Sequence, residues 1–469
     1  PAATQAVGSP VAADGLVVFG AYDGNVRAIR AVEGTLAWQF AASSEIVASV
    51  AVHKGRVIAT SSDGNVYALR LSDGTLLWQT ALGGLGNSSP TVVGTTVVMG
   101  SGFPHKKVVR LNVADGSMAW QTAVGAIADL VNSSVAVSGN DGLIGSTGGI
   151  YYKLDLSTGT PVPFYTTSGT VNFSSPLIVG PTAYLLPGGS DANLYAVTVA
   201  TGAIVAGWPL AIPDPVAAPA DSLPAEMRIG VSSPMQAGSR IVFQIRFDYA
   251  RDTDADTIRD AYTLREYVVA VDPVGPSVAW QSANGSLDTA NANDIPELGM
   301  CPTPAGFSSR VAVASTLQAT LRVLDAAAGG AQLWSSATSA PTRTSPFMSN
   351  GRLFVLGGTG TLQAFLSSVN QPPTAPLPVG PAAGVDLPNA QPVFTWTAGV
   401  DPEAQAVTTT IRIDTDGEVL EDWQEELTTA GNATSASLFS LSKISRNHFR
   451  CCIGDQSAHT VRPKRIVTK

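Results

Sequence analysis

The chain has 469 residues, of which 45% are hydrophobic and only 13% are charged, with 36 acidic against 27 basic side chains and a net charge of −9. Such a small charged share, together with 46 glycines and 31 prolines, favours a β-rich globular protein over long solvated helices or a disordered chain. The acidic balance argues against nucleic acid as a partner, and no apolar run is long enough to span a membrane. Three cysteines are too few for a disulfide framework.

A repeat of about 40 residues organises the first 370 positions. Its parts are a Ser-Pro pair, an apolar strand, an Asp-Gly-Asn turn, a second apolar strand, an Asp-Gly or Thr-Gly turn, and a strand that carries Trp. The first unit runs from Gly8 to Trp38, and the second ends at Trp78. The turn dipeptides supply the positive φ that tight hairpins need. Each unit is therefore predicted to be a small antiparallel sheet, the blade of a propeller.

Later units keep this pattern with decreasing fidelity. One large aromatic per unit is predicted to fill the wedge between neighbouring blades rather than to hold a cofactor. The eighth unit, over residues 344–366, lacks a strand of this kind. We therefore expect an all-β fold, with an eight-bladed β-propeller over residues 1–369 that is closed by Thr4–Val7 as the missing strand.

An acidic motif in the sixth unit has the spacing of a calcium loop. Asp252, Asp254, Asp256 and Asp260 stand at positions 1, 3, 5 and 9, and Ca²⁺ accepts six to eight oxygen ligands. These four residues are the predicted metal site, with calcium as the only expected cofactor. The alternative is a solvated hairpin tip, because Thr257 stands where such loops carry Gly. No catalytic residue is predicted, since the four histidines are scattered and no nucleophile motif occurs.

A proline-rich linker over residues 370–384 separates the repeats from a second domain. Residues 385–469 open like a fibronectin type III or related immunoglobulin-like β-sandwich, with Trp396 as its expected core residue. The tail around Cys451-Cys452 departs from that pattern, and either a divergent final hairpin or an altered end would explain it.

The repeat in residues 49–79 resembles that of quinoprotein-type β-propellers, the family that binds pyrroloquinoline quinone (PQQ) in alcohol dehydrogenases. The resemblance covers roughly residues 1–368 and implies the fold, whereas secreted and outer-membrane assembly propellers share the repeat without being enzymes. An enzyme of this kind would need acidic and amide groups around Ca²⁺, a Trp stacked on the cofactor and, commonly, a vicinal disulfide within the propeller. Cys451-Cys452 lies well past the propeller. We therefore expect the non-enzymatic branch, without bound PQQ.

The expected function is binding, adhesion or assembly by a bacterial protein that is extracellular or on the cell surface. Its expected partner is a protein or a second copy of the chain, joined through sandwich edges, and a surface glycan stays open as a ligand. Two alternatives also stay open. One is a PQQ- and calcium-dependent oxidoreductase of the alcohol dehydrogenase kind, and the other is a periplasmic scaffold for outer-membrane assembly.

Overall fold

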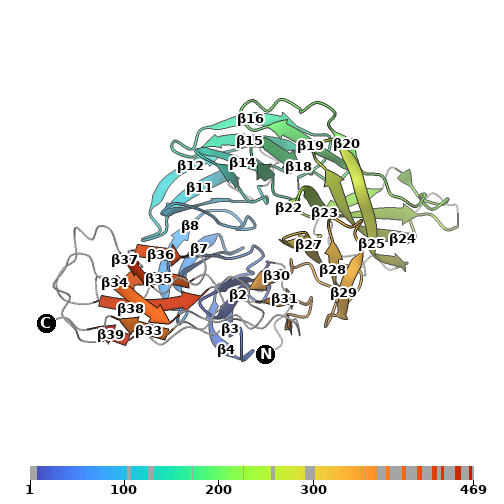
Figure 1. The fold of residues 1–469 in the computed structure, drawn as a ribbon. Helices are drawn as coiled ribbons and strands as arrows, with labels where there is room; N and C mark the ends of the chain where they lie inside the picture. Colours follow the sequence, from blue (N-terminus) through green and yellow to red (C-terminus); the bar gives the residue numbers. More distant parts are fainter. Residues whose placement is uncertain are drawn as a thin grey trace.

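The structure is a computed structural model (Figure 1). It describes residues 8–366 apart from 103–106, 125–130, 172, 225–226, 255–258, 291–300 and 350, and after 366 only the backbone of seven strands. Every regular element in these residues is a β-strand, which confirms the all-β prediction. Among the same residues there is no helix that could span a membrane.

The described part of residues 8–366 forms eight antiparallel sheets that follow one another along the chain. The strands of the first four sheets are β1 (Val11–Ala13), β2 (Leu16–Gly20), β3 (Asn25–Arg30) and β4 (Leu36–Ala41); β5 (Ala51–His53), β6 (Arg56–Thr60), β7 (Asn65–Arg70) and β8 (Leu76–Ala81); β9 (Thr91–Val93), β10 (Thr96–Gly100), β11 (Lys107–Asn112) and β12 (Met118–Ala123); and β13 (Ala136–Ser138), β14 (Asp141–Gly145), β15 (Ile150–Asp155) and β16 (Pro161–Thr166).

The other four sheets keep this order with local changes. Their strands are β17 (Leu177–Val179), β18 (Thr182–Leu185), β19 (Asn193–Thr198) and β20 (Leu210–Ala211); β21 (Arg228–Val231), β22 (Met235–Ala237), β23 (Arg240–Arg251), β24 (Ala261–Asp272) and β25 (Ser277–Thr289); β26 (Ala305–Phe307), β27 (Arg310–Ala314), β28 (Thr320–Asp325) and β29 (Gln332–Ala337); and β30 (Phe347–Ser349), β31 (Arg352–Leu356) and β32 (Leu362–Leu366). Figure 1 shows the sheets arranged around a common centre.

Seven backbone hydrogen bonds of one kind link neighbouring sheets around this centre, and we call the Ser and Thr residues that they connect the hydroxyl circle. In each of the seven, the backbone N–H of one sheet's Ser or Thr donates to the side-chain oxygen of the equivalent residue in another sheet. The bond from Ser9 to Ser49 is 2.8 Å long, and the bond from Ser345 back to Ser9 is 3.0 Å long. Bonds of this kind also lead from Ser49 to Ser89, Ser134 to Ser175, Ser175 to Ser233, Ser233 to Thr303 and Thr303 to Ser345. The last sheet is thus tied directly to the first.

In four of the sheets the recurring Trp lies in the wedge against the next sheet, as predicted. The indole N–H of Trp38 donates to the carbonyl oxygen of Leu71 in the next sheet at 2.7 Å. Trp78, Trp120 and Trp280 make the same bond to Val113, Leu156 and Ala326 at 2.8, 2.8 and 3.0 Å. Since an indole N–H rarely stays buried without an acceptor, this bond fixes the ring in the wedge.

The last sheet has three strands in the described residues, β30, β31 and β32. Its Phe354 and Leu356 form one apolar cluster with Val17 and Phe19 of the first sheet. The predicted fourth strand, Thr4–Val7, lies outside the described residues.

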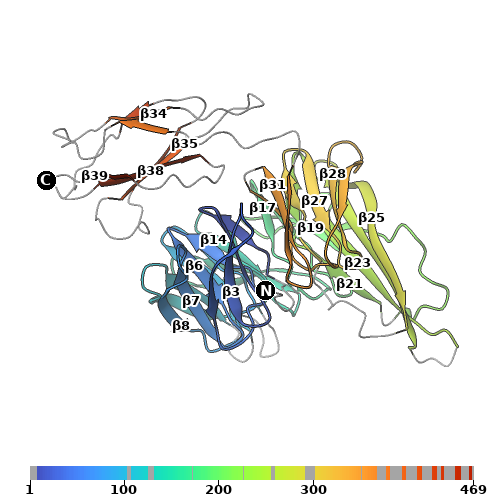
Figure 2. The ribbon, with the colours of Figure 1, turned by 90° about the horizontal axis from the view of Figure 1, so that it is seen from below.

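The sixth sheet is longer than the others. Its strands β23, β24 and β25 have 12, 12 and 13 residues, against five, six and six for β6, β7 and β8. We call their outer parts the arm: Ile245–Arg251, Ala261–Tyr267 and Ala283–Thr289. Figure 2 shows β23 and β25 extending past the neighbouring sheets at the lower right.

After residue 366 the described strands pair in two antiparallel sheets. Their strands are β33 (Leu377–Gly380), β34 (Val393–Thr397), β35 (Thr409–Asp414), β36 (Glu425–Thr429), β37 (Ser435–Ser437), β38 (Phe449–Asp455) and β39 (Lys464–Ile466). One sheet has the order β33-β34-β37 and the other β36-β35-β38-β39. Cys451 and Cys452 belong to β38, opposite Ile413 and Arg412 of β35. The sandwich itself stays a prediction.

Candidate functional site

A small cavity lies along the axis of the sheets, bordered by the hydroxyl circle. Its volume is about 320 Å³, and its walls are mostly Ser, Thr, Ala, Gly and Val. Among the described lining residues, Arg343 is the only cation and Phe173 the only aromatic. The cavity therefore offers small neutral hydrogen-bonding groups and little charge.

These residues do not fit PQQ. A flat molecule with three carboxylates needs several cations and a broad ring to stack on. The four Trp rings whose indole bonds are described above are held in the wedges, away from the axial lining. The one lining guanidinium, that of Arg343, cannot balance three negative charges.

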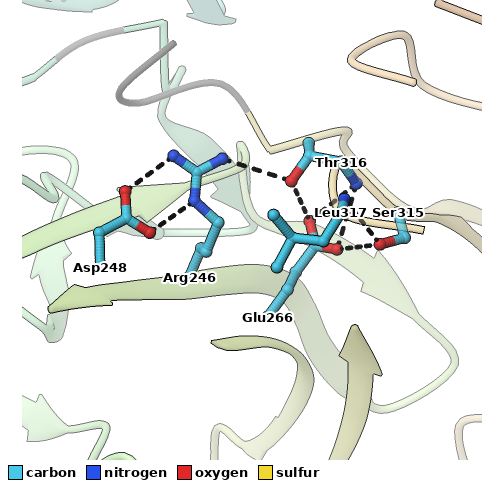
Figure 3. Close-up of polar contacts among 6 residues, drawn as sticks. All are labelled: Arg246, Asp248, Glu266, Ser315, Thr316 and Leu317. Carbon is cyan, nitrogen blue, oxygen red and sulfur yellow. Dashed lines mark hydrogen bonds and ion pairs between the residues drawn. The ribbon is translucent and has the colours of Figure 1, made fainter. Parts of the chain in front are cut away.

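A buried ionic cluster lies at the base of the arm (Figure 3). The guanidinium of Arg246, with no exposed surface, holds both carboxylate oxygens of Asp248 through Nε at 2.7 Å and Nη2 at 2.8 Å. Its Nη1 reaches the hydroxyl of Thr316 in the seventh sheet at 3.3 Å. Because both charged groups are buried, removal of either one would leave the other buried without a partner. The pair therefore fixes the base of the arm in place.

Glu266 of β24 is the second buried carboxylate of the cluster. It accepts hydrogen bonds from the Ser315 hydroxyl at 2.5 Å, the Thr316 hydroxyl at 3.0 Å and the Thr316 N–H at 3.2 Å. The Asn284 amide donates to it from β25 at 3.2 Å and also donates to Gln244 at 2.8 Å. Glu266 therefore connects the sixth sheet to the loop that follows β27 in the seventh.

Burial dominates the acid–base properties of this cluster. It raises the pKa of Glu266, and the hydrogen bonds from Ser315 and Thr316 and the charge of Arg246 only partly oppose that rise. Burial also raises the pKa of Asp248, and the charge and hydrogen bonds of Arg246 only partly oppose that rise. The thiol of Cys301, which borders the axial cavity, has a pKa raised well above its ordinary value by burial. That thiol stays protonated near neutral pH and is a poor nucleophile.

Asp214 braces the middle of the arm. Its carboxylate accepts from the Tyr249 hydroxyl at 2.9 Å, the Tyr267 hydroxyl at 2.8 Å and an Arg265 nitrogen at 3.1 Å. Burial and this carboxylate raise the pKa of Tyr267 to about 12. The loop that carries Asp214 precedes β21, so a segment distant from β24 in the sequence holds the arm in place.

The end of the arm carries the predicted metal residues. The carboxylates of Asp252, Asp254 and Asp260 each have an oxygen within 4.8 Å of the others, whereas Asp256 lies outside the described residues. Thr253 donates to Asp260 from its N–H at 3.0 Å and from its hydroxyl at 2.5 Å, and these bonds lower the pKa of Asp260. The structure thus brings three of the four predicted ligands together, and calcium binding stays a prediction.

Sequence reasoning missed the ionic cluster. Arg246 and Asp248 interrupt the apolar run of β23 two positions apart, and this was the one available signal. Their partners Thr316 and Ser315 come from the next unit, which no local pattern could have indicated.

The PQQ-repeat family described as outer membrane protein assembly factor BamB matches residues 2–207 and 264–368. No curated protein matches the chain. Among solved structures, quinohemoprotein alcohol dehydrogenase from Comamonas testosteroni is 13% identical, with 75% of this chain and 70% of that chain covered and a TM-score of 0.55. The computationally designed Ika8 protein is 14% identical, with 78% and 98% covered and a TM-score of 0.54.

Quinohemoprotein alcohol dehydrogenase ADHIIG from Pseudomonas putida HK5 is 15% identical, with 82% of this chain and 78% of that chain covered and a TM-score of 0.54. At such identities the likeness shows a propeller fold and no activity. The family match omits residues 208–263, which hold Asp214, β21 to β23 and the acidic loop.

Proposed function

This chain belongs to the PQQ-repeat family described as outer membrane protein assembly factor BamB, and from that premise we propose that it is a non-catalytic protein-binding propeller of the cell envelope. It works in the periplasm or at the cell surface, with eight blades closed by the hydroxyl circle. Its C-terminal strands form an immunoglobulin-like sandwich, through whose edges copies of the chain self-associate.

The arm carries this proposal. Residues 208–263, which the family match omits, supply the β23 part of the arm and the Asp214 brace, whereas most of its β24 part and all of its β25 part lie within the matched residues. The arm is held rigidly by the Arg246–Asp248 pair at its base and ends in exposed Asp254 and Asp260. A rigid projection with an acidic end suits a partner surface that is basic, because complementary charge speeds and orients association.

The composition of the axial cavity supports a binding role over quinone chemistry. Its walls supply one cation and one aromatic ring among the described residues. The alternative, an alcohol dehydrogenase, is supported only by the fold that this chain shares with solved structures of such enzymes. The same fold occurs in proteins without that activity, so it does not indicate an enzyme.

Two measurements on the purified chain test the proposal. The first is the absorption spectrum with PQQ and Ca²⁺, together with dye-linked alcohol oxidation; retained quinone with alcohol-dependent turnover would overturn it. The second compares capture of envelope proteins by the wild-type chain and by an Asp254→Lys, Asp260→Lys variant. We expect a protein that the wild type retains and the variant loses. Identical retention by both would contradict the claim that the acidic end of the arm contacts the partner.

A further inference from the structure

Two sets of side chains make up most of the lining of the axial cavity. One set is the hydroxyl circle, and the other consists of the residues two positions before its members. In the second and sixth sheets these residues are Val47 and Val231, whereas in the third, fourth and fifth they are Asn87, Asn132 and Phe173. The third sheet shares an apolar cluster with the fourth, and the fourth shares another with the fifth. Two amides and one aromatic ring therefore come from neighbouring sheets and line one part of the wall.

The two asparagines carry acceptors that no described residue satisfies. The side-chain oxygen Oδ1 of Asn132 is buried and accepts no hydrogen bond from the described part of the chain, and the same holds for Oδ1 of Asn87. The whole Asn132 residue is only 6% exposed. Buried side-chain oxygens are nearly always hydrogen-bonded, because an unpaired one destabilises the fold. Since both residues line the cavity, each oxygen can accept a hydrogen bond from a molecule bound there.

The hydroxyl circle supplies donors to the same space. Each of its seven bonds uses a hydroxyl oxygen as the acceptor, so the hydrogen of that hydroxyl group stays available. None of the seven hydroxyl groups donates this hydrogen to another described residue, and each residue is partly exposed. The cavity thus presents donors around the axis and acceptors where Asn87 and Asn132 lie.

Phe173 has an uncommon backbone conformation for an aromatic residue. Its φ is +61, in the left-handed region, where bulky side chains are rare. The other non-glycine residues with positive φ in the described part of the chain are Asp14, Lys54 and Ser308, which lie in turns between the first two strands of a sheet. No such turn accounts for Phe173, which precedes the fifth sheet. Strained backbone of this kind is concentrated at ligand sites and active sites.

The chemistry of this lining fits a small neutral molecule with several hydroxyl groups. A ligand hydroxyl can accept from the circle and donate to an asparagine oxygen at the same time. A single aromatic ring such as Phe173 can cover the C–H face of a sugar ring. The described lining holds no carboxylate to pair with a cationic ligand. The volume of about 320 Å³ lies at the lower end of ligand pockets, roughly 300–1,000 Å³, which limits the ligand to about the size of a monosaccharide.

We propose that the axial cavity binds one pyranose sugar, either as a free monosaccharide or as the terminal residue of a glycan. Hydroxyl groups of the sugar donate to Asn87 and Asn132 and accept from the hydroxyl circle, and its C–H face lies on Phe173. No described lining residue belongs to the arm, so this site stands or falls apart from the role proposed for the arm.

Saturation-transfer nuclear magnetic resonance with the full chain tests the proposal. The probes are glucose, galactose, mannose and N-acetylglucosamine, each as the free sugar and as its methyl glycoside. We expect saturable binding of at least one probe with a Kd of about 1 mM, as suits a ligand of this size. Binding should weaken at least tenfold in Asn132→Leu and in Phe173→Leu. Asn140→Leu is the matched control, since Asn140 lies in an exposed turn of the same sheet as Asn132 and does not line the cavity.

The two forms of each probe distinguish the two sources of the sugar. A methyl glycoside that binds as tightly as the free sugar indicates the end of a glycan, whereas loss of binding on methylation indicates a free monosaccharide. Absence of binding of every probe up to about 50 mM, well above the expected Kd, would overturn the proposal. Equal binding by the Asn132→Leu and Asn140→Leu chains would overturn it as well.

Thermal melting without sugar gives a second measurement. Because Asn132→Leu removes an unpaired buried acceptor, its Tm should equal or exceed that of the wild type while sugar binding is lost. A clear fall in Tm would show that the Asn132 amide is bonded within the fold, and this would contradict its assignment to a ligand. If the Asn132→Leu chain does not fold, Asn87→Leu gives the same test with the second unpaired oxygen.

Discussion

Glu266 and Ser315 come from neighbouring sheets, and their side-chain oxygens lie 2.5 Å apart with neither residue exposed to solvent. This contact and the bonds to Thr316 join the base of the arm to the seventh sheet. A carboxylate in such a place is stabilised only by its neighbours, so the cluster makes the position of the arm depend on a few polar contacts.

Replacing Arg246 with Met should destabilise the protein strongly. The change leaves Asp248 buried without its partner, and breaking a buried pair costs about 3–5 kcal/mol. Arg251→Met is the control on the same strand, since its pair with Asp221 is partly exposed and worth at most about 1 kcal/mol. Thermal melts followed by near-ultraviolet circular dichroism should show a clearly larger drop in Tm for Arg246→Met. Equal drops would mean that the cluster does not stabilise the arm.

The raised pKa of Glu266 predicts a pH dependence of stability. In the folded state the carboxyl keeps its proton to a higher pH than in the unfolded state, whose pKa is near the ordinary 4.5. The folded form therefore binds more protons between these two pKa values, and stability falls as pH rises from about 4.5 through the folded pKa. Asp248 has a raised pKa as well. It is present both in the wild type and in a Glu266→Gln variant, so its contribution cancels when the two proteins are compared.

Tm measured from pH 4 to pH 8 for the wild type and for Glu266→Gln checks this point. Glutamine cannot titrate, so the Tm of the variant should fall less over this range, whatever its stability at pH 4. Parallel curves would show that the Glu266 pKa is not raised.

The sequence predicted the repeat well, because its causes are local. Ser-Pro pairs, Asp-Gly turns and one Trp per unit repeat along the chain, and Trp38 lies in its wedge as predicted. The cluster of Arg246 and Glu266 could not be predicted, since its bonds to Ser315 and Thr316 join positions 49 to 70 residues apart. The acidic loop was predicted in part. The spacing of Asp252, Asp254 and Asp260 predicted that their carboxylates lie close together, which they do, but spacing does not show whether an ion binds there.

Calcium should bind weakly at the end of the arm. Three carboxylates within 4.8 Å of one another repel unless a cation or solvent screens them. Calorimetric titration should give a Kd of about 10⁻⁴–10⁻³ M, the range of extracellular modules. Asp254→Asn with Asp260→Asn should abolish the heat, whereas Asp115→Asn, at an exposed turn of the third sheet, should leave it unchanged. A wild-type chain that gives no heat up to 10 mM Ca²⁺, about tenfold above that range, would refute calcium binding here.

The packing of Trp38 against Gly74 predicts a difference between two glycines with similar backbones. Gly74 and Gly139 both have positive φ, +75 and +59, so an alanine at either position is strained by about 1–2 kcal/mol. Only at Gly74 would the new methyl group meet an aromatic ring, that of Trp38 at 2.6 Å, and overpacking adds about 1–3 kcal/mol. Urea unfolding followed by tryptophan fluorescence should therefore show a lower midpoint for Gly74→Ala than for Gly139→Ala. If the two midpoints agreed, the turn glycines would be required for their backbone conformation alone, and the contact between sheets would not explain why glycine recurs there.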